Sequence, residues 1–246
     1  MKRFLFAAVL CLALFSIIGC EKNKGKGKEQ EKPVLVKRIK TYSLVGEGWA
    51  DNYQYSYDAQ GRVSRIFREE GKAWDFSYDG NKVTVKDAKG DVAFDITLGT
   101  NNYCQTMKKD GKDEYTYTYD ADGYMTKCMK GKDVASNITI KDGCISVWTR
   151  WKDGVEQFKE HTYIQDKNLG GIHNIHSESC GLDRWMFETG LFGKGTAYLC
   201  GSNKWQHLDM GATLSYDYDK DGYVTAEHKI FNGEREEFQY TWELVK

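Results

Sequence analysis

Apolar and polar side chains alternate with a period of two along most of the chain, and residues 53–63 show this pattern most clearly. Tyrosines alternate there with small polar residues up to Asp58, which is typical of a strand with two unlike faces. Asp58 can cap a turn, and Gly61 can adopt the positive φ that a three-residue hairpin loop needs. We therefore expect a hairpin in which Tyr57 lies opposite Val63.

The same pattern recurs at steps of about 21 residues, which is room for two strands of about seven residues and their turns. The recurring segments are 55–58, 76–79, 96–99, 117–120, 138–141 and 214–219. Successive hairpins with short loops predict an all-β fold, an up-and-down antiparallel meander of about 14–16 strands. A sheet of that length has to curl into a barrel or half-barrel.

One face of this sheet is expected to be rich in aromatic residues and the other to be wet, as is common for antiparallel sheets. Applying the same loop at residues 120–124 places Tyr119 opposite Met125 and Tyr117 opposite Lys127. The residues assigned to aromatic-rich faces are Tyr53, Tyr55, Tyr57, Val63, Phe67, Tyr115, Tyr117, Tyr119, Met125, Tyr216 or Tyr218, Phe238, Tyr240 and Trp242. Strands of about seven residues are shorter than the nine to eleven that cross a bilayer, so a membrane-spanning barrel is not expected.

The repeat breaks between about residues 170 and 210. Residues 182–190 lack the alternation and predict one short helix, with Asp183 at its N-terminus and Gly190 at its C-cap. An apolar helix between strands should cover an open end of the sheet or fill its concave side.

The first residues predict an exported, lipid-anchored protein. Lys2 and Arg3 precede an apolar run of about fourteen residues, which is the length of a signal-peptide core. Ile17-Ile18-Gly19-Cys20 then resembles a bacterial lipobox, which implies that Cys20 is acylated and becomes the mature N-terminus. We expect residues 1–19 to be a lipoprotein signal peptide, residues 20–33 a disordered lysine-rich tether, and residues 34–246 a single antiparallel β domain.

Charge adds little to this picture. The chain carries 35 basic and 36 acidic residues, and removing residues 1–19 leaves 33 against 36. There is no global basic field, so nucleic acid is not an expected partner. The basic tether favours an outer-membrane or cell-envelope protein that is anchored by its lipid and faces the periplasm.

Five cysteines remain once Cys11 and Cys20 are set aside, so at least one thiol is free if the others pair within the chain. Cys180 and Cys200 flank the irregular region, and a bridge between them is one alternative. The other three fall on different predicted strands and are interpreted as small buried hydrophobes: Cys104, Cys128 and Cys144.

Two segments carry potential metal ligands, but neither completes a site. Asp217, Asp219 and Asp221 match the start of a calcium loop, yet the position of the required glutamate holds His228. The segment with His173, His176 and Cys180 has three zinc-type ligands and no identifiable fourth. The sequence therefore predicts no metal and no cofactor, with the aspartates as the remaining calcium candidate.

No catalytic constellation is recognisable, since Ser177 and Ser179 near His176 do not lie in a nucleophile-elbow sequence. Four tryptophans surround the irregular region: Trp148, Trp151, Trp185 and Trp205. They are the candidate ligand-binding residues, because exposed aromatic rings stack on sugar faces. The alternative is that these rings fill the concave core.

The lipobox, the Tyr-Asp-x-x-Gly hairpins, the helix near Trp185 followed by residues 190–193, and the closing segment 216–225 together resemble a known group. The group comprises uncharacterised lipoproteins of Bacteroidetes-type bacteria, a domain of unknown function with a porin-like antiparallel β fold. The resemblance implies a curled or closed sheet and supplies no catalytic residues. A weaker likeness is to the tyrosine-aspartate repeats of bacterial secreted shell proteins.

Three functions stay open from the sequence. The first is a non-enzymatic module, anchored in the membrane by its lipid, that binds a glycan or an envelope protein. The second is a hydrolase with a site near the insertion of residues 173–205, with His173, His176 and nearby acidic residues as its candidates. The third is a purely structural envelope protein.

Overall fold

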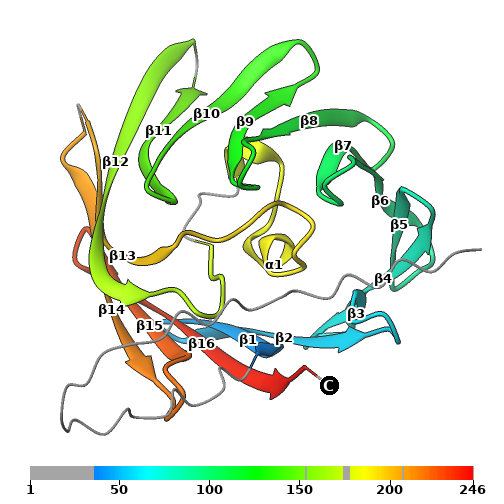
Figure 1. Ribbon diagram of the computed structural model, residues 1–246, viewed down its shortest axis with the longest axis horizontal. Coiled ribbons are helices and arrows are strands. Elements are labelled where there is room, and N and C mark those ends of the chain that lie inside the picture. Colours follow the sequence, from blue (N-terminus) through cyan, green and yellow to red (C-terminus); the bar gives the residue numbers. More distant parts are fainter. Residues whose placement is uncertain (1–35, 153, 174–177, 207, 246) are drawn as a thin grey trace, which may run out of the picture. The chain divides into compact units, whose positions relative to one another are not determined.

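The computed structural model describes residues 36–152, 154–173, 178–206 and 208–245, and within them sixteen antiparallel strands form a closed barrel (Figure 1). Each strand pairs with its neighbours in sequence, and β1 pairs with β16 to close the ring. The strands are β1 (Lys37–Gly46), β2 (Trp49–Tyr57), β3 (Val63–Arg68), β4 (Lys72–Asp79), β5 (Lys82–Asp87), β6 (Val92–Leu98), β7 (Cys104–Lys109), β8 (Asp113–Tyr119), β9 (Met125–Lys130), β10 (Asp133–Lys141), β11 (Cys144–Lys152), β12 (Val155–Lys167), β13 (Tyr198–Trp205), β14 (Met210–Tyr218), β15 (Val224–Phe231) and β16 (Glu234–Leu244). The predicted all-β meander with one short helix is confirmed.

The predicted hairpin loop is also confirmed. Tyr57 pairs with Val63, and the Gly61 backbone, at φ 78°, donates to the Asp58 carbonyl over 3.0 Å. The Asp58 carboxylate accepts from the backbone N–H of Arg62 at 2.9 Å, which fixes the loop. Equivalent bonds recur in the loops at residues 120–124 and 219–223.

Two assignments of side chains to faces are wrong, and both errors follow from β-bulges. Tyr117 pairs with Cys128 instead of Lys127, because the register shifts between Thr118 and Tyr119. A similar shift next to Tyr57 turns Ile66 inward and leaves Phe67 outside and 37% exposed. One extra residue in a strand reverses the alternation beyond it.

The barrel has two unlike ends. The hairpin end carries the short connections that follow each odd-numbered strand, from β1–β2 to β15–β16. The plug end carries the loops that follow β2, β4, β6, β8, β10 and β14, the start of β1 and the end of β16. The connection from β12 to β13 also begins and ends there, and we call its described residues, 168–173 and 178–197, the plug.

The plug occupies the middle of the barrel (Figure 1). It contains the 3₁₀ turn η1 (Glu178–Cys180) and the helix α1 (Arg184–Phe187), which is shorter than the predicted helix of residues 182–190. Thr189 ends the helix early, because its hydroxyl and its backbone N–H both donate to the Met186 carbonyl, at 2.5 and 3.1 Å. Asp183 stands at the N-cap but makes no side-chain capping bond. Neither helix in the described part of the chain is long and apolar enough to cross a membrane.

Barrel tyrosines fasten the plug to the wall. The Tyr55 hydroxyl donates to the Trp185 carbonyl at 3.1 Å, and the Tyr117 hydroxyl donates to the Cys180 carbonyl at 2.8 Å. The Trp185 ring stacks on Trp74 with centroids 4.4 Å apart. The inward aromatic side chains therefore serve as core that packs against a piece of the same chain.

Candidate functional site

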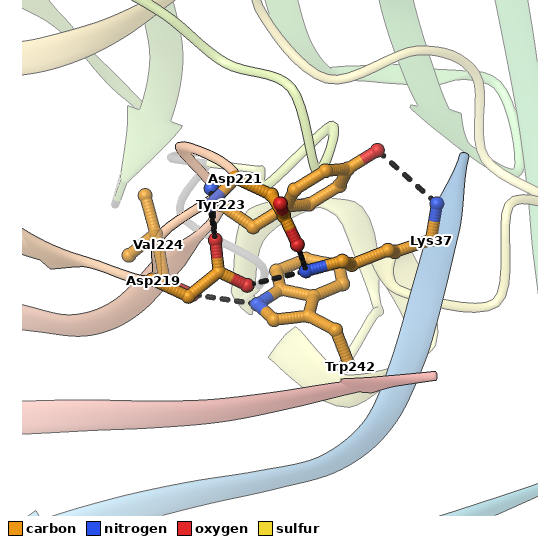
Figure 2. Close-up of polar contacts among 6 residues, drawn as sticks. All are labelled: Lys37, Asp219, Asp221, Tyr223, Val224 and Trp242. Carbon is orange, nitrogen blue, oxygen red and sulfur yellow. Dashed lines mark hydrogen bonds and ion pairs between the residues drawn. The ribbon is translucent and has the colours of Figure 1, made fainter. Parts of the chain in front are cut away.

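The three aspartates of the calcium candidate are divided between two neighbours. Lys37 places its Nζ 2.6 Å from a carboxylate oxygen of both Asp219 and Asp221 (Figure 2). Asp217 instead lies 2.9 Å from the ring of His228. The lysine ammonium thus occupies the position between two carboxylates that a cation would take. In the described residues no group of three or more histidine, cysteine or acidic side chains converges on one point.

This cluster closes the barrel at the plug end. The Lys37 backbone N–H donates to the Tyr223 hydroxyl at 3.1 Å, and Trp242 Nε1 donates to the Val224 carbonyl at 2.7 Å (Figure 2). Hydrogen bonds to Asp219 and then to Asp221 raise the pKa of Lys37. Asp219, Asp221 and Tyr223 therefore fasten the β14–β15 hairpin to β1, and calcium binding by the aspartates stays a prediction.

The four candidate tryptophans do not form one platform. Trp148, Trp185 and Trp205 are buried, between 1% and 3% exposed, while Trp151 lies outside beside a groove at the hairpin end. Trp148 and Trp205 lie close together, with ring centroids 6.2 Å apart. Three of the rings thus take part in interior packing, and a binding role for the four stays a prediction.

The predicted alternative of a disulfide between Cys180 and Cys200 is wrong. All five described cysteines are free and buried, so Cys180 and Cys200 are not bridged. The tyrosine contact to the Cys180 carbonyl places that residue against β8, far around the barrel from β13. Cys104, Cys128 and Cys144 are buried as small apolar side chains, as predicted. Residues 1–33, with Cys20, and also His176 and Ser177 lie outside the described residues.

A cleft of about 540 Å³ opens at the plug end between the plug and the barrel rim. We call it the mouth cleft. The rim and the plug contribute charged, aromatic and glycine residues, among them Lys37, Tyr57, Tyr124, Glu188, Lys194 and Trp242. A concave site of this size is typical for a small-molecule ligand.

A carboxyl group and an imidazole of the plug line the mouth cleft. Glu188 is half-buried, but its Oε1 is fully buried with no hydrogen-bond partner among the described residues. Burial raises the pKa of Glu188 to about 8, so at neutral pH the carboxyl group is mostly protonated. His173 is 4% exposed, its ring stacks on Phe187, and burial, followed by the charge of Arg184, lowers its pKa to about 4.

Inward from the mouth cleft, the plug carries a buried ion pair. Arg184 Nη2 lies 3.0 Å from Glu227 Oε2 and 3.0 Å from the Tyr240 hydroxyl, and its guanidinium stacks on Phe238 at 3.6 Å. Glu227 is 0% exposed. The pair joins α1 to β15 and β16 across the interior.

The sequence offered few signals for this arrangement. It singled out His173 but not Glu188, because one of 36 acidic residues cannot be distinguished without the fold. The one available signal was the position of Glu188 on an apolar helix next to Phe187, where a charged residue is out of place.

Comparison with known proteins agrees with the barrel. A family model described as the Teneurin YD-shell matches residues 33–137. A porin-like protein from Bacteroides uniformis superposes with a TM-score of 0.68 at 19% identity, covering 83% of this chain and 98% of that one. A porin-like protein from Bacteroides vulgatus gives a TM-score of 0.56 at 10% identity, covering 84% and 99%. No curated protein matches the chain.

Proposed function

We propose that this chain is a lipid-anchored protein of the bacterial cell envelope that binds a small polar ligand, such as a glycan fragment, in the mouth cleft and does not catalyse a reaction on it. The observation that carries the proposal is the cleft itself, with a buried carboxyl oxygen of Glu188 that has no described partner. A protonated carboxyl group both donates and accepts hydrogen bonds, as does a sugar hydroxyl. Tyr57, Tyr124 and Trp242 add aromatic surface.

Transport through the barrel does not fit this geometry. The plug fills the middle of the ring, and its Trp185, Met186 and Phe187 are at most 3% exposed. A porin keeps an aqueous lumen, whereas this interior is packed. The ligand is therefore held at the mouth.

The outer wall suits water better than lipid. Its side chains pair through polar contacts, including Thr41 with Thr241 at 2.6 Å, Thr162 with Ser202 at 2.7 Å and Arg65 with Asp75 at 3.4 Å. A lipid-facing wall carries an apolar band instead. Attachment to a membrane is thus assigned to the lipid on Cys20, and the periplasm is the proposed location.

Ligand binding is tested with the full chain on a glycan array, followed by calorimetry on any glycan that binds. We expect Glu188→Leu to weaken binding about tenfold or more and Glu188→Gln, which still forms hydrogen bonds, to retain most of it. Asp183→Asn, an exposed position beside the same helix, is the matched control. Absence of binding to any glycan, or equal binding by wild type and Glu188→Leu, would refute the mouth cleft as the site.

A hydrolase is the second candidate, because His173 and Glu188 line the same cleft. In that case the bound glycan would be cleaved by the wild type and left intact by Glu188→Gln. Binding without cleavage supports the first proposal.

The anchor is tested separately by growing cells with radiolabelled palmitate. We expect label in the wild type and none in Cys20→Ala. Equal labelling of both, or of neither, contradicts the lipid anchor without bearing on the cleft.

A further inference from the structure

On one side of the hairpin end, inward side chains of β11, β12, β14 and β15 are only partly buried. They are Arg150, Gln157, Leu214, Lys229 and Phe231. We call this partly exposed part of the interior the recess; it lies at the opposite end of the barrel from the mouth cleft.

Lys159 lies at the inner end of the recess and is 3% exposed. On the sheet it pairs with Trp148 on one side and Trp205 on the other. Its ammonium is 5.3 Å from the Trp205 ring centroid, and the Arg150 guanidinium is 4.1 Å from the same ring. Two cations therefore converge on one indole.

No acidic side chain of the described residues lies within ion-pair distance of Lys159. The two interior carboxylates nearby are already engaged, Glu227 with Arg184 and Glu236 with Lys229 at 2.5 Å. A buried charge is normally paired, because its desolvation is otherwise uncompensated. Consistent with this, burial and then the charge of Lys229 lower the pKa of Lys159 to about 7.

The wall beside Lys159 holds further polar groups without described partners. His161 is 8% exposed, and neither ring nitrogen has a hydrogen-bond partner among the residues that the structure describes. Asn203, directly opposite on β13, is 7% exposed with its Oδ1 also unpartnered. The next residue across the sheet is the small, buried Ala212. Buried polar groups in this state are typically completed by water or a ligand.

We propose that the recess binds a small oxyanion, a carboxylate or phosphate group, held by Lys159 and Arg150 over Trp205, with the ring N–H of neutral His161 donating a further hydrogen bond to it. An arginine such as Arg150 binds an oxyanion through a planar pair of N–H donors. A lysine binds it as a point charge. The bound charge would compensate the Lys159 ammonium, which has no acidic partner among the described residues. The recess is separate from the mouth cleft, so an experiment can refute one binding proposal without refuting the other.

The test uses the full chain with sodium phosphate and sodium succinate as probes, against sodium chloride at equal ionic strength. Melting temperature and tryptophan fluorescence are both followed, since Trp205 and Trp148 line the site. We expect one of the probes to raise the melting temperature of the wild type in a saturable way. The probe that binds more tightly tells phosphate from carboxylate chemistry.

Lys159→Met should weaken probe binding about tenfold or more, which is the loss expected for one charge-assisted hydrogen bond. Without a probe it should melt at the same temperature or higher, because an unpaired buried charge has been removed. Lys204→Met is the matched control: it adjoins Trp205, but its side chain is 71% exposed on the outer face. If Lys159→Met does not fold, His161→Leu takes its place. No saturable response to either probe, or equal responses in wild type and Lys159→Met, would overturn the proposal.

Discussion

The two sides of the barrel interior are filled by different kinds of side chain. From β3 to β9 the buried side chains are all apolar, and many are 0–2% exposed, among them Ile66, Val85, Cys104, Met107 and Cys128. From β11 to β16 the inward positions include Arg150, Lys159, His161, Glu227 and Lys229. The first side is an ordinary apolar core that packs on the plug. The second is a polar interior held by ion pairs and cation–aromatic contacts.

The apolar side contributes most of the folding stability, and the polar side offers the groups that can bind a ligand. An apolar interior gains free energy from every buried group, roughly 25 cal/mol per Å². A buried ion pair contributes little net free energy, because desolvation cancels most of the attraction. Burying polar groups on this side therefore costs free energy that a bound ligand would offset. This is also the side where the recess lies.

Breaking the ion pair of the polar side should give the largest effect. Glu227→Leu leaves the Arg184 guanidinium buried without its carboxylate, and we expect a loss of about 4 kcal/mol in the free energy of unfolding, measured with urea. The double variant Arg184→Met/Glu227→Leu should recover most of that loss. A single variant that costs less than about 1 kcal/mol would mean that the pair behaves like a surface ion pair.

Removing an apolar side chain from the other side should cost slightly less. Ile66→Ala deletes three methylene-sized groups from a site that is 0% exposed, and we expect a loss of about 3 kcal/mol in urea unfolding. Phe67→Ala, on the outer face of the same strand, is the control and should cost much less. Equal losses at the two positions would contradict the bulge that turns Ile66 inward.

The polar side should also make stability depend on pH. The pKa of Lys159 is about 7 in the folded chain against an ordinary value of 10.5, so between these values the unfolded state binds more protons. Stability from this group therefore rises with pH above about 7, by at most about 1.4 kcal/mol per pH unit. Lys159→Met should remove that rise between pH 7 and 9, whereas Lys204→Met should keep it. Identical pH profiles for the two variants would contradict the buried, unpaired state of Lys159.

The smallest effect is expected where the apolar side meets the plug. Tyr117→Phe deletes the hydroxyl that donates to the Cys180 carbonyl and should cost about 1 kcal/mol in urea unfolding. Tyr218→Phe removes an exposed bond to Asp166 and should cost less than about 0.5 kcal/mol. If Tyr117→Phe is as stable as the wild type, the plug does not depend on this contact.

The apolar side is also the more predictable one. There the alternation of aromatic and polar residues, with a turn at each Asp-x-x-Gly, was enough to predict the strands, the loops and most inward side chains. The errors at Phe67 and Lys127 arose from bulges, which insert one residue without a distinctive sequence signal. The same turn chemistry was what made the aspartates at 217, 219 and 221 resemble a calcium loop.

The polar side and the sites could not be predicted in the same way. An inward lysine such as Lys159 has the same alternation as an outward one, so the pattern cannot tell a charged interior from a wet surface. Glu188 and the mouth cleft depend on where the plug lies, and that position is set by contacts distant in sequence, such as Arg184 with Glu227. Of the four candidate tryptophans only Trp185 lies in the plug, whereas the other three lie on β11 and β13, and this distribution required the fold.

The pairing of the first strand with the last has a consequence for how this molecule is made. Lys37 is matched with Leu244, so β1 keeps one bare backbone edge until β16 has formed and paired with it. Contacts so far apart in sequence close late and slowly. Until then both bare edges can recruit strands from other chains. A chaperone that shields unpaired strand edges should therefore raise the yield of folded protein. It should act mainly before β1 and β16 pair.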